Sequence, residues 1–226
     1  MGIFFELFVK LPAYIPVTIF IALISMILAI LIGLFITWLQ LSKNKVLIFI
    51  SQVYISLFRG MPNACSICSL FFIGLPQLFP AFKGMSALTA ALIGLGLKEA
   101  AYLSEIFRAA INSIDKGQIE AGEALNIPAW KVFLHVILPQ ATLNALPATG
   151  NTFISLLKET SLAFTLGITE LFGNAKMIAG ESFRYFETYL AVGLLYWIMI
   201  VVYTWVQKQF EKELEIPYRR DLHDSY

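Results

Sequence analysis

Five charged side chains stand in largely apolar stretches of this sequence, and they are its first candidates for chemistry. Lys98, Glu99 and Glu105 follow a run rich in Ala and Gly, and Lys158 and Glu159 lie in a second stretch. Charged groups are costly in hydrocarbon, so they normally face a cavity, pair with one another or reach the membrane surface. Three interpretations are open: salt bridges that fix helix packing, charges held at the membrane surface, or groups that bind a polar solute.

Neutral polar side chains accompany the second charged pair. They can bond a bound solute, or they can bond backbone carbonyls and neighbouring helices. The candidate solute-binding residues are Lys98, Glu99, Asn151, Ser155, Lys158, Glu159 and Thr160.

The sequence gives little indication of redox chemistry, metal binding or catalysis. Cys65 and Cys68 form a C-x-x-C, but residues 61–74 contain no Lys, Arg or His to favour a reactive thiolate. His135 and His223 are the only histidines, and neither belongs to a metal-ligand pattern. We therefore expect neither redox chemistry nor a metal site, and no nucleophile with a base indicates an enzyme.

The composition indicates that most of this chain is surrounded by lipid. Apolar residues make up 58% of the 226 residues and charged residues 14%, against about 45–50% and about 25% in soluble domains. The formal net charge of +1 gives no indication of nucleic-acid binding. We predict an all-α integral membrane protein with a single domain over residues 14–212 and a charged tail over 213–226. Its five spanning helices are expected at about 14–40, 62–79, 84–107, 143–166 and 187–207.

The segment before the second span is less apolar. Residues 43–59 are followed by Gly60, Met61 and Pro62, which together stop a helix. The second span therefore begins near Pro62 or uses part of the preceding helix. Arg59 is interpreted as an anchor at the cytoplasmic interface, and a substrate ligand is the alternative.

Basic residues favour one orientation, because Lys and Arg stay on the cytoplasmic side. With the N-terminus outside, the outer segments hold only Lys10, Lys83, Lys176 and Arg184. We therefore expect the N-terminus outside and the C-terminus in the cytoplasm.

The polar loop 113–140 reads as two short helices. Asp115 and Gln118 have the spacing of a capping box, and Asn126 with Pro128 breaks the first helix. In the second, Trp130, Phe133, Leu134 and Ile137 form one apolar stripe, and Pro139 is expected to end it. Such a pair can lie on the membrane, pack on its own bundle or dock into a partner.

This loop resembles the EAA loop of membrane subunits of ATP-binding cassette importers, whose pattern is E-A-A, three residues, G, nine residues, then I-x-L-P. Glu120-Ala121-Gly122, Asn126 and residues 136–139 (VILP) agree with it in spacing at every position. Gly122, Asn126 and Val136 depart from it in residue type. Asn tolerates the left-handed backbone nearly as well as Gly does. The usual Ser-Pro-Trp is replaced by Pro128-Ala129-Trp130.

The resemblance covers nearly the whole chain. Residues 54–62 (YISLFRGMP), 100–105 (AAYLSE) and 150–162 (GNTFISLLKETSL) are similar to permeases of the polar amino acid uptake family. Residues 113–118 and 195–214 look most like permeases for L-cystine. Lys98-Glu99 departs from that family, which usually has Asn and a small residue there.

The resemblance implies a type I importer permease fold in the cell membrane, with a path for L-cystine or a related polar amino acid. Glu99 or Glu159 would then meet the substrate ammonium, and Lys98 or Lys158 its carboxylate. The implied coupling residues are Glu120, Ala121, Gly122, Asn126, Trp130, Leu138 and Pro139.

The implied partners include a separate ATP-binding cassette ATPase subunit, which would bind ATP and Mg, because this chain has no phosphate-binding loop motif and no cofactor of its own. An extracytoplasmic amino-acid-binding protein would dock on residues 75–82 and 168–188. A second copy of this chain, or a related permease, would complete the path. An ATP-independent secondary transporter is the alternative, but the sequence lacks the inverted repeats typical of that class.

Overall fold

The computed structural model describes residues 2–61, 70–80 and 83–223, and all regular structure within them is helical. The chain begins with α1 (Gly2–Lys10) and a 3-10 turn (Leu11–Tyr14), which lead into α2 (Ile15–Gln40). The middle elements are α3 (Lys45–Gly60), a π-helical turn (Leu70–Gly74), α5 (Leu75–Leu78) and α6 (Ala87–Asn112). The remaining elements are α7 (Lys116–Ala124), α8 (Ala129–Val132), a π-helical turn (Phe133–Ile137), α9 (Leu138–Glu159), a 3-10 helix (Thr160–Leu166), α10 (Leu171–Ser182) and α11 (Tyr185–His223).

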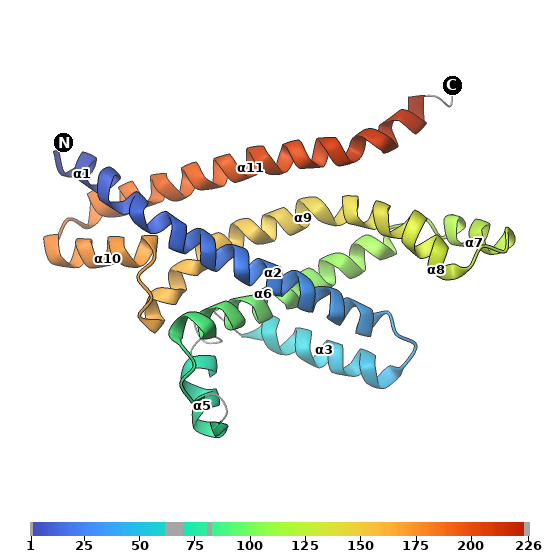
Figure 1. Ribbon diagram of the computed structural model, residues 1–226, viewed down its shortest axis with the longest axis horizontal. Coiled ribbons are helices and arrows are strands. Elements are labelled where there is room, and N and C mark those ends of the chain that lie inside the picture. The colour runs from blue at the N-terminus through green and yellow to red at the C-terminus, as the bar shows by residue number, and fades with distance from the viewer. Residues whose placement is uncertain (1, 62–69, 81–82, 224–226) are drawn as a thin grey trace.

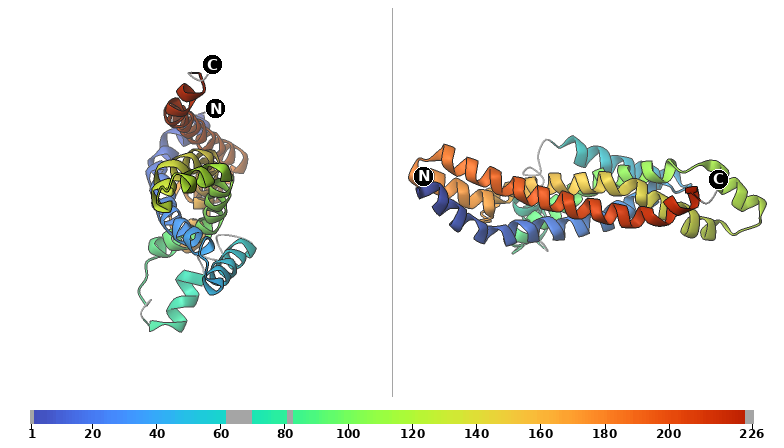
Figure 2. Two further views of the ribbon diagram at one scale, coloured as in Figure 1. Left: turned by 90° about the vertical axis from the view of Figure 1, so that its right-hand side faces the viewer. Right: turned by 90° about the horizontal axis from the view of Figure 1, so that it is seen from above.

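The long helices α2, α6, α9 and α11 run along the long axis of the molecule (Figure 1). α1 and α10 lie at one end, and α7 with α8 lies at the other, as a second direction of view confirms (Figure 2). α3 folds back beside α2 and α6, and α5 projects from the bundle. The charged loop is therefore held at one tip of an elongated bundle.

Small residues bring α2 and α6 close together. A Cβ on Gly33 would lie 3.1 Å from the Leu103 Cβ, and one on Gly96 would lie 3.1 Å from the Leu28 Cβ. Thr37 donates to the Ser104 carbonyl at 3.1 Å across the same contact. Close approach through small residues, with hydroxyls bonding across helices, is how helices pack in lipid.

Two helical segments of the described chain, Phe5–Gln40 and Tyr185–Leu214, are long and apolar enough to cross a membrane. α6 and α9 have 26 and 22 residues but carry charged and polar side chains along their course. Much of the predicted span 62–79, with Cys65 and Cys68, lies outside the described residues. The count of five spans therefore stays a prediction.

Several boundaries differ from those expected. The helix predicted at 84–107 is α6, which Ser86 caps by accepting from the Thr89 N–H. The span predicted at 187–207 is part of α11, which continues through the charged tail as far as His223. α1 and α10 were not predicted, because with 9 and 12 residues both are too short to be recognised as spanning helices.

Pro139 does not end the loop helix, contrary to expectation. The helix continues from α8 through the π-helical turn into α9, with the Leu138 N–H donating to the Phe133 carbonyl. A proline ring clashes with the carbonyl four residues earlier and lacks a donor. The wider π turn before Pro139 relieves both problems. The predicted helix 143–166 accordingly starts at Leu138, and it changes to 3-10 geometry after Glu159.

Glu170 joins three helices at the end of the bundle that holds α1 and α10. It is fully buried and caps α10, accepting from the backbone N–H groups of Gly173 at 2.6 Å and Phe172 at 3.0 Å. The Thr18 hydroxyl of α2 and the Tyr196 hydroxyl of α11 also donate to it, at 3.2 and 3.1 Å. A buried carboxylate is tolerated here because four donors and a helix N-terminus stabilise it.

Candidate functional site

A polar cavity of about 450 Å³ lies between α3, α6 and α9. It brings together five of the predicted solute-binding residues, from helices that are far apart in sequence. Its polar and aromatic lining comprises Arg59, Lys98, Glu99, Tyr102, Glu105, Asn151, Thr152, Ser155 and Glu159.

Lys98 is the centre of an ion network in this cavity. Its Nζ lies 2.5 and 2.6 Å from the two carboxylate oxygens of Glu159, and 3.0 Å from Oε1 of Glu99. The ammonium also lies 5.4 Å from the centroid of the Tyr102 ring. Lys98 is 8% exposed and Glu99 3%. Lys98 of α6 and Glu159 of α9 therefore pair with each other across 61 residues of sequence.

Arg59 also lines this cavity. Its guanidinium lies 5.4 Å from the Tyr102 ring centroid, on the side of the cavity formed by α3. Because α3 turns back along α2, its last turn lies beside the middle of α6, and the role of Arg59 as an anchor at the cytoplasmic interface stays a prediction. Within the described chain, no carboxylate forms an ion pair with it. The helix stop at residues 60–62 was recognisable, but the return of α3 was not.

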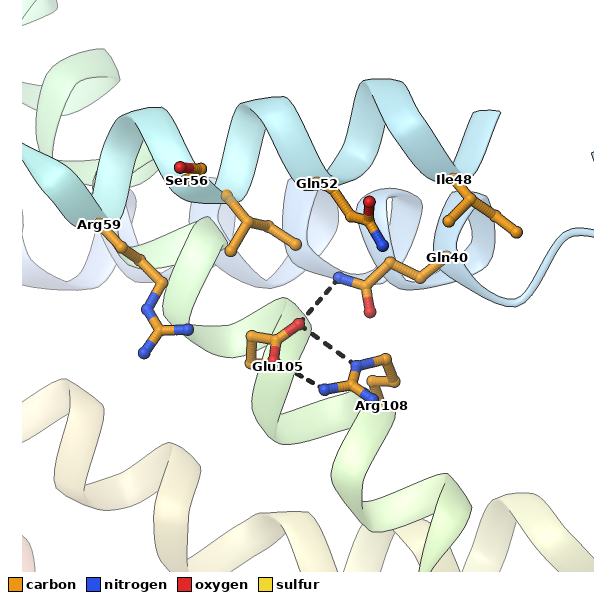
Figure 3. A pocket seen from close by; sticks show the side chains of 8 residues that line it. Gln40, Ile48, Gln52, Ser56, Arg59, Glu105 and Arg108 are labelled. Carbon is orange, nitrogen blue, oxygen red and sulfur yellow. Dashed lines mark hydrogen bonds and ion pairs between the residues drawn. The ribbon is translucent and has the colours of Figure 1, made fainter. Parts of the chain in front are cut away.

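A second polar cavity, of about 550 Å³, lies between α2, α3 and α6 (Figure 3). Glu105 is held in it by Arg108, whose Nη2 lies 2.8 Å from Oε2, and by Gln40, whose Nε2 lies 3.1 Å from Oε1. Gln52 and Ser56 line it from α3. Arg59 and Glu105 line both cavities. The two cavities therefore meet along one polar stretch of α6.

Two predicted solute-binding residues do not line the first cavity. Lys158 is exposed on the surface of α9. Thr160 is fully buried and donates to the Leu157 carbonyl at 2.8 Å, within its own helix turn.

The helices α7 and α8, with the π-helical turn that follows them, form a hairpin over residues 116–137. This hairpin has the helix caps that its sequence predicts, with one difference. Asp115 caps α7 by accepting from the Gly117 N–H at 2.8 Å, and Asn126 has the left-handed backbone, with φ of 55°. Gln118 does not complete a capping box, because its side chain exchanges two hydrogen bonds with the Gln140 amide, at 3.1 and 2.7 Å. This pair instead ties α7 to the start of α9.

Gly122 allows α7 and α8 to touch. It is buried, and a Cβ there would lie 2.6 Å from Cγ2 of Val132. Gly122 stands where the EAA pattern has Ala, and the missing methyl group leaves the space that the β-branched side chain of Val132 fills.

We expect Gly122→Leu to force the two helices apart. Overpacking of this kind costs about 1–3 kcal/mol, so protease cleavage of the hairpin should become faster. Gly180→Leu is the control, because nothing lies within 4 Å of a Cβ at Gly180. Equal cleavage rates in the two variants would contradict the packing described here.

The outer face of the hairpin is apolar and uncovered. Trp130 is 63% exposed, Leu125 73% and Leu134 50%. Val132 and Ile137 are buried against the bundle. The predicted stripe is thus divided, with Ile137 facing inward and Trp130 and Leu134 facing outward.

The predicted coupling residues occupy distinct places in this hairpin. Glu120 and Ala121 are exposed on α7, beside a groove of about 570 Å³ that lies between α7 and α8. Leu138 and Pro139 begin α9 at the base of the hairpin.

Most of the chain matches known transport proteins. Residues 29–216 match the family described as the inner membrane component of binding-protein-dependent transport systems. The chain is 52% identical to the probable amino-acid permease protein YxeN of Bacillus subtilis (strain 168) over 204 residues, which are 90% of this chain and 91% of that protein. It is 33% identical to the L-cystine transport system permease protein TcyL of the same organism, covering 91% and 87% of the two chains.

Solved structures agree with this family. A crystal structure of an amino acid ABC transporter with histidines matches with a TM-score of 0.82 and 31% identity, over 94% of this chain and 96% of that one. An inward-facing methionine transporter, MetNI, shares the fold with a TM-score of 0.71 at 20% identity. The predicted type I importer permease fold is confirmed by these matches. The chain belongs to the binding-protein-dependent inner membrane components, the permease subunits of ATP-binding cassette importers.

Proposed function

We propose that this permease subunit forms the translocation path for L-cystine or a related polar amino acid, and that a separate ATPase subunit drives it with ATP and Mg. The names of the relatives support an amino acid substrate, including L-cystine for TcyL. The mid-helix cavity beside Arg59 supports a path through α3, α6 and α9.

In this proposal, Arg59 receives the substrate carboxylate. A guanidinium binds a carboxylate through two parallel hydrogen bonds, and Arg59 has no competing ion pair within the described residues. Asn151 and Ser155 face the same cavity from α9 and supply neutral polar contacts. The second cavity, reached past Arg59 and Glu105, leads the substrate toward the end of the bundle that holds α7 and α8.

The exposed apolar hairpin is the observation that carries the coupling proposal. A Trp that is 63% exposed at the tip of a bundle is typical of a residue that a partner covers, because aromatic side chains dominate protein interfaces. We propose that Trp130 and Leu134 insert into a groove on the surface of the ATPase subunit, and that Glu120 and Ala121 lie at the rim of that groove. When the ATPase subunit closes its groove around the hairpin, it would move α9, which continues directly from the hairpin.

Two further partners belong to this proposal, an amino-acid-binding protein and a second copy of this chain. An amino-acid-binding protein would dock on residues 75–82 and 168–188. Of these, α10 lies at the end of the bundle opposite α7 and α8, α5 projects from the side of the bundle, and residues 81–82 lie outside the described residues. A second copy of this chain would complete the path as a homodimer. The basic residues support an N-terminus outside and a C-terminus in the cytoplasm.

Purification of the tagged chain from its native membrane tests this proposal. We expect an ATP-binding subunit to copurify, and the complex to hydrolyse ATP faster when a loaded amino-acid-binding protein is added. A chain that purifies alone, and that accumulates amino acid in ATP-free vesicles under an ion gradient, would instead be a secondary transporter.

A further inference from the structure

The acidic groups of the central cavity are already bound to a cation that belongs to the protein. The Lys98 ammonium lies within 3.0 Å of three carboxylate oxygens, two from Glu159 and one from Glu99. It also faces the Tyr102 ring at 5.4 Å. Carboxylates together with an aromatic face are the groups that recognise ammonium and guanidinium ions. Lys98 therefore fills a complete cation site.

This arrangement decides which charges the cavity can accept. Arg59 and Lys98 balance Glu99 and Glu159, and Glu105 is paired with Arg108. Arg59 is the cavity cation without an ion pair among the described residues. A substrate carboxylate thus finds a partner, whereas a substrate with a cationic side chain finds each cavity carboxylate engaged and meets two positive groups.

We propose that Lys98 is a specificity-determining residue that excludes amino acids with a net positive charge. This inference rests on the proposed amino acid transport, and it specifies the substrate class as amino acids without a net positive charge, a class that includes L-cystine. If Lys98 only fixed the packing of α6 against α9, removing it would lower stability without changing which amino acids bind.

Arginine and citrulline provide a matched pair of probes, since citrulline is a nearly isosteric, uncharged analogue of arginine. Binding of each is measured on the purified complex of permease and ATPase without the binding protein, whose own selectivity would otherwise intervene. The test variant is Lys98→Met with Glu99→Gln, which removes one charge of each sign and leaves Glu159 free beside Tyr102. A second variant adds Glu159→Gln, and Lys98→Arg keeps the cation.

We expect the parental complex to bind citrulline more tightly than arginine. In the test variant, the affinity for arginine relative to citrulline should rise by about 10- to 100-fold, the range for one hydrogen bond to a charged group. Adding Glu159→Gln should cancel this gain. Lys98→Arg should keep the parental preference, as should Lys45→Met, which removes an exposed lysine at the start of α3.

Three results would overturn the inference: a parental complex that binds arginine as tightly as citrulline, a test variant that binds citrulline normally without gaining arginine, or a gain that survives Glu159→Gln. The first needs no variant, so the inference stays testable even if the substituted complexes fail to assemble. Failure of the proposed function is distinguishable, because the parental complex would then bind no amino acid, L-cystine included, and both ideas would fall.

Discussion

Glu170→Leu is expected to destabilise the end of the bundle that holds α1 and α10 by roughly 4 kcal/mol. The substitution would leave the Tyr196 hydroxyl and the N–H groups of Phe172 and Gly173 without their acceptor, while the Thr18 hydroxyl would keep only the Tyr14 carbonyl at 3.4 Å. Each buried donor left unpaired costs about 1–3 kcal/mol, which is a large share of a typical folding free energy of about 5–15 kcal/mol. Thermal unfolding of the detergent-purified protein, followed by size-exclusion chromatography, measures the loss.

Two further variants make this experiment specific. Glu170→Gln keeps one carbonyl acceptor and should fall between the parent and the leucine variant. Glu181→Leu removes an exposed carboxylate of α10 and should unfold near the parental temperature. A leucine variant at position 170 with parental unfolding would show that the three helices are joined by other contacts.

Arg59→Met is expected to reduce amino acid binding by about 100-fold. The variant removes the guanidinium proposed to hold the substrate carboxylate, and a hydrogen bond to a charged group contributes about 1.5–3 kcal/mol. Arg59→Lys should retain part of the affinity, because lysine keeps the charge but loses the two-pronged geometry. Equilibrium binding of L-cystine to the purified complex measures the change.

A decarboxylated analogue separates this role from a general packing defect. Cystamine lacks both carboxylates of L-cystine, so its weak binding should be nearly the same in parent and Arg59→Met. If the variant weakened cystamine as strongly as L-cystine, Arg59 would act through the shape of the cavity and not through the carboxylate.

Local features of the hairpin could be predicted from the sequence. Asp115 starts α7 and Asn126 takes the left-handed backbone, because capping and turn preferences depend on a few neighbouring residues. The charged residues of α6 and α9 were recognisable for a similar reason, since any charge in an apolar stretch demands a partner.

The pairing of those charges could not be predicted. From the sequence, each lysine could pair with the glutamate next to it or with a glutamate of the other helix. Only the packing of α6 against α9 selects Glu159 as a partner of Lys98. The contact of Arg59 with the cavity could not be predicted, because it depends on the return of α3 along α2. The end predicted at Pro139 was wrong, because a π turn accommodates the proline within a continuous helix. Glu170 gave no signal, since its donors lie up to 152 residues away.

The hairpin is proposed to couple ATP hydrolysis by the ATPase subunit to movement of α9. The rate of ATP hydrolysis by the reconstituted complex measures this coupling. Glu120→Lys reverses the charge of an exposed residue at the proposed rim of the ATPase groove, and Glu123→Lys makes the same change three residues further along α7. We expect Glu120→Lys to lower substrate-stimulated hydrolysis at least about tenfold, as expected for a disrupted interfacial charge contact, and Glu123→Lys to stay near the parental rate. A Glu120→Lys complex that assembles, hydrolyses ATP in response to substrate and transports at the parental rate would contradict the proposed coupling.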